Sequence, residues 1–287
     1  MCQGVTSLAT PLDLLRSTLA GLPGLRPLDP AGYARAHRTY EAHSDQRALL
    51  TAGLAIGLDA ALPGPGARSV LSIGPGDGSL DAPLAAALAP SRGPLRWVAA
   101  EPDGTVGARC RERVERALGP GGEAVLHAGT FGSLAGTVGE EVFDLVLAVH
   151  SLYYVPDLAE ALDAVAARLA PGGSAVLALA PLGDLNQLTS TVDPTSHRWW
   201  SGDLLAALPA AGLTATTTRV AGRLDVTSCL DPTSVTGREV LDFAVGADCS
   251  VLDDDARGVL LDALAAIAVR EGDRLLVPHP VDVVTAV

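Results

Sequence analysis

The stretch VLSIGPGDGSLD, residues 70–81, is a short apolar run that breaks into a glycine-rich loop and then into a helical segment. Gly74, Gly76 and Gly78 let the backbone turn tightly and approach a ligand without a Cβ in the way. The helix that follows contributes free N–H groups at its beginning. Because such a loop also occurs as an ordinary tight turn, its meaning depends on what surrounds it.

Outward from this loop, apolar strands alternate with helices. The strand patterns RSVLSIG, LRWVAAE, EAVLHAG, FDLVLAVH and SAVLALA are separated by helical stretches such as SLDAPLAAALA and DLAEALDAVAARLA. This alternation predicts βαβ units and a parallel sheet covered on both faces. The β-prone TATTTRV and RLDVTSC and the final VDVVTAV predict an antiparallel hairpin at one edge. We therefore expect a Rossmann-like, doubly wound α/β fold with a mostly parallel seven-stranded sheet and an antiparallel C-terminal edge.

The chain before the loop has a different character. Residues 11–28 carry enough Pro and Gly for a short helix and a loop, and residues 33–58 have helical spacing with few breakers. The PGPGA run at 63–67 is typical of a linker. We expect an N-terminal helical cap over residues 1–62, a core over 63–287, and substrate-pocket elements within 181–287.

Composition excludes several classes of function. Of the 287 residues, 48% are hydrophobic, which suffices for a sizeable core, and the formal charge of −13 disfavours nucleic acid as a partner. No stretch approaches the roughly 20 continuous apolar residues of a membrane span, and the four cysteines show neither CxxC spacing nor the density of a disulfide scaffold. We expect a cytoplasmic protein without a nucleic-acid, membrane or metal partner. The oligomeric state is open, with a monomer favoured.

An acid ends the second strand of the pattern. Glu101 comes 23 residues after Gly78, where a carboxylate can accept hydrogen bonds from both ribose hydroxyls of an adenosine. Dehydrogenases and methyltransferases both meet this requirement. The Pro-Gly-Gly turn in ARLAPGGSAVLALA, which joins a helix to the fifth strand, separates the two classes, because an NAD enzyme lacks it.

The order of these features resembles the class I S-adenosylmethionine-dependent methyltransferases: GxGxG, an acid after strand two, FDLVLA and LAPGGSAVL. The resemblance implies S-adenosylmethionine as the cofactor and S-adenosylhomocysteine as the product. It places the glycine loop beside the methionine part, the acid on the ribose, and the adenine near HAGTFGS. The cofactor residues implied in this way are Gly74, Gly76, Gly78, Glu101, Thr130, Phe131 and Val149.

A closer resemblance extends from about Tyr33 to Val287. The segments SVLSIGPGDGSLD, AAEPD, SLYYVPD, SGDLLAALPAAGL, DVTSC and REGDRLLVPHPVDVVTAV are similar, in this order, to the histamine N-methyltransferase family. In that family the N-terminal helix, the loop after strand four and the last strand enclose a small amine. The acceptor-binding residues implied for this chain are Tyr33, His37, Tyr40, Gln46, His150, Tyr153, Tyr154 and His279.

The polar residues of this implied pocket depart from the family pattern. The family has a glutamate that pairs with the amine at the position of Gln46, a glutamine at the position of His150, and an asparagine at the position of His279. An enclosed ammonium needs a carboxylate, which Gln46 does not supply, although Asp45 would supply one after a shift of one residue. We expect a small-molecule acceptor methylated on nitrogen, an amine or an imidazole-like ring, and not histamine itself.

His150 and Tyr154 are the candidate catalytic residues. Methyl transfer is an in-line displacement that depends mainly on orientation, and it needs a base only if the nucleophile arrives protonated. A histidine suits that task, unless His150 only ends the strand or orients Tyr153. An O- or C-methyltransferase of specialised metabolism with His150 as base is one alternative, and a non-catalytic cofactor-binding or partner protein is another. His37, His150 and His279 would form a metal site only if they converged.

Overall fold

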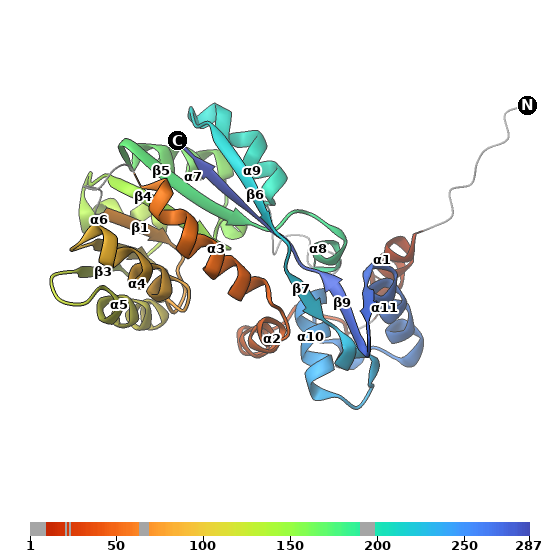
Figure 1. Cartoon of the computed structure of the whole chain (residues 1–287). Helices are drawn as coiled ribbons and strands as arrows, with labels where there is room; N and C mark the ends of the chain where they lie inside the picture. The colour runs from red at the N-terminus through yellow and green to blue at the C-terminus, as the bar shows by residue number, and fades with distance from the viewer. Residues whose placement is uncertain (1–9, 21, 23, 63–68, 190–198) are drawn as a thin grey trace, which may run out of the picture. The chain divides into compact units, whose positions relative to one another are not determined.

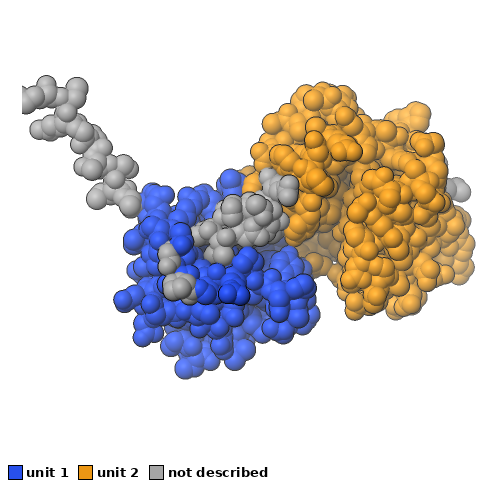
Figure 2. All heavy atoms as spheres, turned by 180° about the vertical axis from the view of Figure 1, so that it is seen from behind, with its two compact units in different colours: residues 1–46, 182–197, 221–279 blue, residues 47–181, 198–220, 280–287 orange. Residues whose placement is uncertain are grey.

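The computed structural model describes residues 10–20, 22, 24–62, 69–189 and 199–287. The chain forms two compact units, coloured separately in Figure 2, and passes between them several times. Unit 1 comprises residues 1–46, 182–197 and 221–279, and unit 2 comprises residues 47–181, 198–220 and 280–287. Both units are therefore built from segments that are far apart in the sequence.

Unit 2 is a seven-stranded sheet with helices on both faces (Figure 1). Its strands are β1 (Ser69–Ile73), β2 (Arg96–Ala100), β3 (Glu123–His127), β4 (Phe143–Val149), β5 (Leu169–Leu179), β6 (Ala215–Val220) and β10 (Val281–Ala286). Its α-helices are α3 (Gln46–Ala61), α4 (Asp81–Arg92), α5 (Gly104–Leu118), α6 (Ala135–Val138), α7 (Leu158–Ala167) and α9 (Ser201–Ala207), and short 3-10 turns cover Phe131–Ser133, Leu152–Tyr154 and Leu208–Ala211.

The strand order is β3-β2-β1-β4-β5-β10-β6. Strands β1 to β5 pair in parallel, whereas β10 is antiparallel to both β5 and the edge strand β6. This sheet confirms the doubly wound fold that the alternation of strands and helices predicts, including the antiparallel pairing of TATTTRV with the C-terminal strand.

The two faces of the sheet carry separate hydrophobic clusters. Successive strand residues point to opposite faces, so Leu71 joins the cluster under α7 and α9, while Val70 joins the cluster under α3, α4 and α5. Because both faces are buried, the strands are almost continuously apolar, as in FDLVLAV of β4.

The Pro-Gly-Gly turn lies inside β5. Strands β4 and β5 pair on both sides of it, with a shift in register between Phe143 and Leu145. A Cβ on Gly173 would lie 2.9 Å from the carbonyl oxygens of Ala170 and Phe143, so only glycine fits there. The turn expected before the fifth strand is thus a bulge within it.

Unit 1 is a helical body with a three-stranded antiparallel sheet, ordered β7-β9-β8. Its helices are α1 (Pro11–Ala20), α2 (Pro30–Ala42), α8 (Asp184–Thr189), α10 (Val235–Val245) and α11 (Asp254–Ile267), its strands are β7 (Arg223–Asp225), β8 (Val269–Glu271) and β9 (Arg274–Pro278), and 3-10 turns cover Thr227–Leu230 and Cys249–Val251. In the described part of the chain, no helix combines the length and the apolar character needed to cross a membrane.

Two sequence-based expectations differ from this arrangement. RLDVTSC does not join the edge of the main sheet, because its strand β7 pairs with β9 of the smaller sheet. The boundary expected at residue 62 falls inside unit 2, since α3 packs on the main sheet, whereas α1 and α2 pack on α11 and α10 of unit 1. Helices at the two ends of the chain thus share one core.

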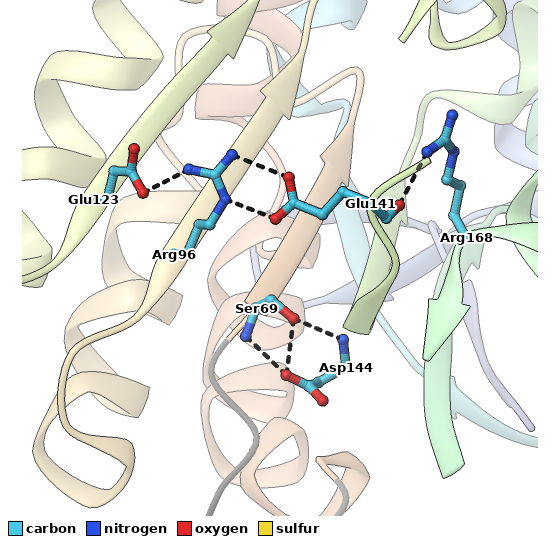
Figure 3. Close-up of polar contacts among 6 residues, drawn as sticks. All are labelled: Ser69, Arg96, Glu123, Glu141, Asp144 and Arg168. Atoms are coloured by element: carbon cyan, nitrogen blue, oxygen red, sulfur yellow. Dashed lines mark hydrogen bonds and ion pairs between the residues drawn. The ribbon is translucent and has the colours of Figure 1, made fainter. Parts of the chain in front are cut away.

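Polar side chains fasten the main sheet at the edge where its parallel strands begin (Figure 3). Arg96 of β2 donates to both carboxylate oxygens of Glu141, at 2.7 and 3.0 Å. The backbone N–H and the hydroxyl of Ser69, the first residue of β1, donate to Asp144 Oδ2 at 2.9 and 2.8 Å. The Ser69–Asp144 bonds join the neighbouring strands β1 and β4, and the Arg96–Glu141 pair connects β2 to the segment before β4, at the edge opposite the glycine loop.

We predict that Asp144→Ala lowers the free energy of unfolding by about 2 kcal/mol, because it leaves two half-buried donors of Ser69 without their acceptor. Denaturant unfolding measures the change. Asp163→Ala, which removes an exposed carboxylate from α7, should stay within about 0.5 kcal/mol of the wild type. Equal losses in the two variants would contradict this assignment.

Candidate active site

The glycine loop follows β1 at the carboxyl edge of the sheet. Gly74, Gly76 and Gly78 have φ values of 64°, 60° and 74°, which glycine adopts at little cost. A Cβ on Gly74 would lie 2.6 Å from Ser151 Cβ, and a Cβ on Gly78 would lie 2.8 Å from Cys110 Cα. A Cβ on Gly76 would meet nothing within 4 Å. Two of the glycines therefore permit close packing, and the third lies against open space.

Glu101, directly after β2, fastens this loop. Its Oε2 accepts the N–H of Gly76 at 3.0 Å, and its Oε1 accepts the N–H of Asp103 at 3.1 Å. An ionised carboxylate has about four lone-pair positions, so these two bonds leave acceptor capacity for hydroxyl groups of a ligand. The sequence predicts that Glu101 binds a ligand. The structure shows that Glu101 also holds the glycine loop through its hydrogen bond with Gly76.

A buried carboxyl group lies behind the loop. Asp81, the first residue of α4, is 2% exposed and accepts the indole N–H of Trp97 at 3.1 Å. Burial raises the pKa of Asp81 to about 6, although hydrogen bonds from Ser72 and Trp97 act in the opposite direction. The helix that follows the glycine loop thus begins with a carboxyl group whose pKa is about 6.

His127 at the end of β3 holds the loop that the resemblance places near an adenine. Its Nε2 lies 3.1 Å from the carbonyl oxygen of Thr130, and its Nδ1 lies 2.6 Å from the hydroxyl of Thr137. Nε2 also lies 2.9 Å from the hydroxyl of Ser133, so both ring nitrogens are hydrogen-bonded within this segment. Thr130 is exposed, and the half-buried Phe131 packs partly against the core.

His150 directly follows β4 and has a strained backbone. Among the residues that the structure describes, it is the one non-glycine with a positive φ, 54°. Strain of this kind persists mainly at functional sites. Its ring stacks on Tyr153, and its Nδ1 lies 3.0 Å from the Tyr153 hydroxyl, which accepts the N–H of Ala180 at 2.6 Å. The imidazole is thereby held beside Ser151, the residue that packs on Gly74.

The two tyrosines after His150 have different surroundings. Tyr153 is 5% exposed, whereas Tyr154 is 53% exposed. The ring of Tyr153 also meets Tyr154 and Trp200 edge-on, with centroids 6.0 and 5.7 Å apart. Tyr153 is therefore a support for His150, and Tyr154 remains a predicted contact of the acceptor. Val149, the last residue of β4, is half-buried against the core on the α3–α5 side.

The other residues assigned to the acceptor lie in unit 1, where most of them form an aromatic row. Tyr33 stacks on His37 with centroids 5.9 Å apart. Phe243 of α10 contacts Tyr33, His37 and Tyr40, at 5.4, 5.0 and 4.6 Å, and Tyr40 meets His279 edge-on at 5.2 Å. Sequence reasoning did not include Phe243, because nothing in the sequence connects α10 to α2.

The polar residues beside the aromatic row are bonded within unit 1. Gln46 Nε2 donates to the carbonyl of His279 at 2.9 Å, and the Ser44 hydroxyl lies 2.7 Å from His279 Nδ1. Burial lowers the pKa of His279 to about 4, despite the attraction of Asp45 for the charged form, so the ring is neutral at pH 7. Asp45 itself accepts the backbone N–H of Arg223 at 2.6 Å. The carboxylate considered as an ammonium partner is thus used within the protein.

No group of three or more His, Cys, Asp or Glu side chains within the described ranges is placed to hold a metal ion. His37 and His279 belong to unit 1, and His150 belongs to unit 2.

A family model described as a methyltransferase domain matches residues 42–207, more than half of the chain. The chain belongs to this methyltransferase family. The match contains the glycine loop, Glu101 and His150, and the cofactor of the domain is S-adenosylmethionine.

Solved structures share the fold of this methyltransferase. The YcgJ protein from Bacillus subtilis has a TM-score of 0.57 and 14% identity, over 81% of this chain and 96% of that chain. A provisionally assigned methyltransferase from Bacillus halodurans C-125 has a TM-score of 0.50 and 20% identity, over 81% of this chain and 97% of that chain. At such identities the likeness concerns the fold alone. No curated protein sequence matches the chain.

The residues of unit 2 fit the cofactor of the methyltransferase family. Open space lies over Gly76, and Glu101 has acceptor capacity for ribose hydroxyls. Beside Gly74, the buried hydroxyl of Ser151 has no hydrogen-bond partner among the described residues, which is costly unless a ligand or water supplies one.

We predict that S-adenosylhomocysteine raises the melting temperature of the methyltransferase and that Glu101→Ala removes most of this shift, because the ribose loses its acceptor. Titration calorimetry should show a roughly tenfold or greater rise in Kd. Glu112→Ala, which truncates an exposed acid on α5, is the matched control and should bind normally. A wild-type protein that shows no shift would contradict the assignment.

Asp81 provides a pH test. Its folded-state pKa of about 6 lies above the ordinary value of 3.8, so the folded protein binds the proton more tightly and loses stability as pH rises from about 4 to 6. The contribution is about 3 kcal/mol. Denaturant unfolding of Asp81→Asn should therefore show stability relative to the wild type that increases by this amount between pH 4 and pH 7. A difference that stays constant with pH would disprove the assignment.

Proposed function

We propose that this methyltransferase transfers a methyl group to a nitrogen of a small, neutral acceptor, an amine in its uncharged form or an imidazole-like ring, and that histamine is not the substrate. The observation that carries the methyl transfer is the glycine loop held by Glu101, beside which the strained His150 lies. The sequence resemblance to the histamine N-methyltransferase family supports nitrogen as the acceptor atom.

In this proposal the chain's own residues orient the acceptor and receive its proton. When bound, S-adenosylmethionine supplies an electrophilic methyl group on a sulfonium. The displacement needs a lone pair aligned with that methyl group, and His150 accepts a proton from any nucleophile that arrives protonated. Tyr153 fixes the imidazole ring through its hydroxyl, which is itself held by the N–H of Ala180.

The polar residues of unit 1 support a neutral acceptor. Gln46 carries no charge, and Asp45 is bonded to Arg223. An ammonium enclosed beside them would compete with Arg223 for the carboxylate of Asp45, and a buried charge left unpaired costs several kcal/mol. The rings of Tyr33 and His37 are proposed to contact a planar acceptor, a surface on which flat rings stack well.

Methylation of oxygen or carbon is the alternative activity, and the hydrogen-bonded His150 is the observation that favours it. A phenol, a hydroxyl or an acidic carbon must lose a proton to react, whereas a neutral ring nitrogen needs only orientation. A base at this position is therefore more valuable to the alternative acceptors than to an imidazole.

Mass spectrometry with a deuterated-methyl cofactor separates these activities. The purified protein is incubated with a mixed panel of amines, imidazoles, phenols and keto acids. Label on an amine or imidazole nitrogen supports the proposal, and label confined to phenols or keto acids supports the alternative. If the protein binds S-adenosylhomocysteine but labels nothing in the panel, the protein is a non-catalytic cofactor binder.

We predict that His150→Ala lowers kcat more for an acceptor that arrives protonated than for a neutral one, because only the former needs the base. Tyr153→Phe should lower kcat by roughly tenfold, with KM little changed, and should shift the pH dependence of turnover, since the ring of His150 loses its hydrogen bond. Steady-state kinetics across pH measures both effects. Equal losses for the two kinds of acceptor would mean that His150 only positions the substrate.

A further inference from the structure

Unit 1 contains a cavity of about 470 Å³ that lies apart from the residues discussed above. Its wall comes from the segment before α2, the first turns of α2, the first half of α10 and the segment that follows α10. None of the rings of the aromatic row lines it. A volume of this size suits a small-molecule ligand.

Backbone hydrogen bonds give the wall a defined shape. The segment before α2 pairs with the end of α10 through the isolated bridge between Pro27 and Ala247. The N–H of Leu28 donates to the carbonyl of Gly246 at 3.2 Å, and the N–H of Asp248 donates to the carbonyl of Arg26 at 3.3 Å. Two segments that are distant in the sequence are thus held together along this wall.

Three arginines, Arg26, Arg35 and Arg238, line the cavity. Within the described part of the chain, none of their guanidinium groups forms a hydrogen bond or an ion pair. The chain has a formal charge of −13, so acids are abundant. All three arginines are exposed and the lining also holds four carboxylates, so an anion would be bound here by hydrogen bonds from the guanidinium groups and not by an excess of positive charge.

The four acids of the same wall each form a hydrogen bond within the protein. Each of the four carboxylates accepts a hydrogen bond: Asp29 from the N–H of Gly32, Glu239 from the hydroxyl of Thr39, Asp242 from the N–H of Cys249, and Asp248 from the N–H of Ser250. Arg238 attracts Asp242 and Asp248 from beyond ion-pair distance and lowers the pKa of Asp248, with a smaller effect than the hydrogen bonds from Ser250. The wall therefore offers unused guanidinium donors beside carboxylates that keep some acceptor capacity.

We propose that this cavity binds an oxyanion, a phosphate or a carboxylate group of a small metabolite, through Arg26, Arg35 and Arg238. A guanidinium presents a planar fork of donors that matches both groups in a bidentate manner. The remaining lone pairs of the neighbouring acids accept from hydroxyl or amino groups elsewhere on the same ligand. The site does not depend on the proposed methyl transfer, because it shares no residue with the cofactor loop or with His150.

Titration calorimetry with inorganic phosphate and with citrate, at pH 7 and with ionic strength matched by sodium chloride, tests the proposal. We expect at least one anion to bind the full-length protein. Arg26→Gln, Arg35→Gln and Arg238→Gln should each weaken that binding roughly tenfold or more. Binding of phosphate alone identifies a phosphate ligand, and binding of citrate alone identifies a carboxylate ligand.

Arg270→Gln is the matched control, because Arg270 is an exposed arginine of β8 in the same unit that does not line the cavity. This variant should bind the anion like the wild type, and Arg35→Lys, which keeps the charge but loses the fork, should bind less tightly than the wild type. Unchanged S-adenosylhomocysteine binding and far-UV circular dichroism verify that each variant is folded. If neither anion binds beyond the chloride control, or if Arg270→Gln weakens binding equally, the proposal is wrong.

Discussion

The absence of room for a side chain at Gly74 and Gly78 is the constraint on which the candidate active site depends. The first glycine touches the residue that follows His150, and the second touches the backbone of α5. Two close contacts therefore place the glycine loop, the candidate base and the helix beside Glu101 in one arrangement. A methyl group at either position would push these parts away from each other.

The main sheet differs between the end where its parallel strands begin and the end where they finish. Where the parallel strands begin, Arg96 is hydrogen-bonded to Glu141, and Asp144 accepts a hydrogen bond from Ser69. Where they end, the chain holds a left-handed histidine and a buried carboxyl group, both of which cost stability. Strong bonds at one edge offset strain at the other, so the edge that carries chemistry need not be the edge that stabilises the fold.

The sheet was predictable from the sequence because each βαβ unit is a local pattern, with its strand, turn and helix adjacent in the chain. His150 was found for a similar reason, since it interrupts a continuous apolar run. The division into units was not predictable, because α1 and α2 pack on helices more than a hundred residues away and β7 pairs with β9 of the smaller sheet. Phe243 and the three arginines of the cavity were missed for the same reason. Their roles arise only when distant segments meet, and no spacing records such a meeting.

The position of β10 has a consequence for how the protein is made. It lies between β5 and β6, so the edge strand β6 has no partner in the sheet until β10 is added. During synthesis the first five strands can assemble as they leave the ribosome, but the sixth must wait with both of its edges unpaired. The exposed surface of β6 includes the charged side chain of Arg219, and a charge on an unpaired strand disfavours its pairing with other chains.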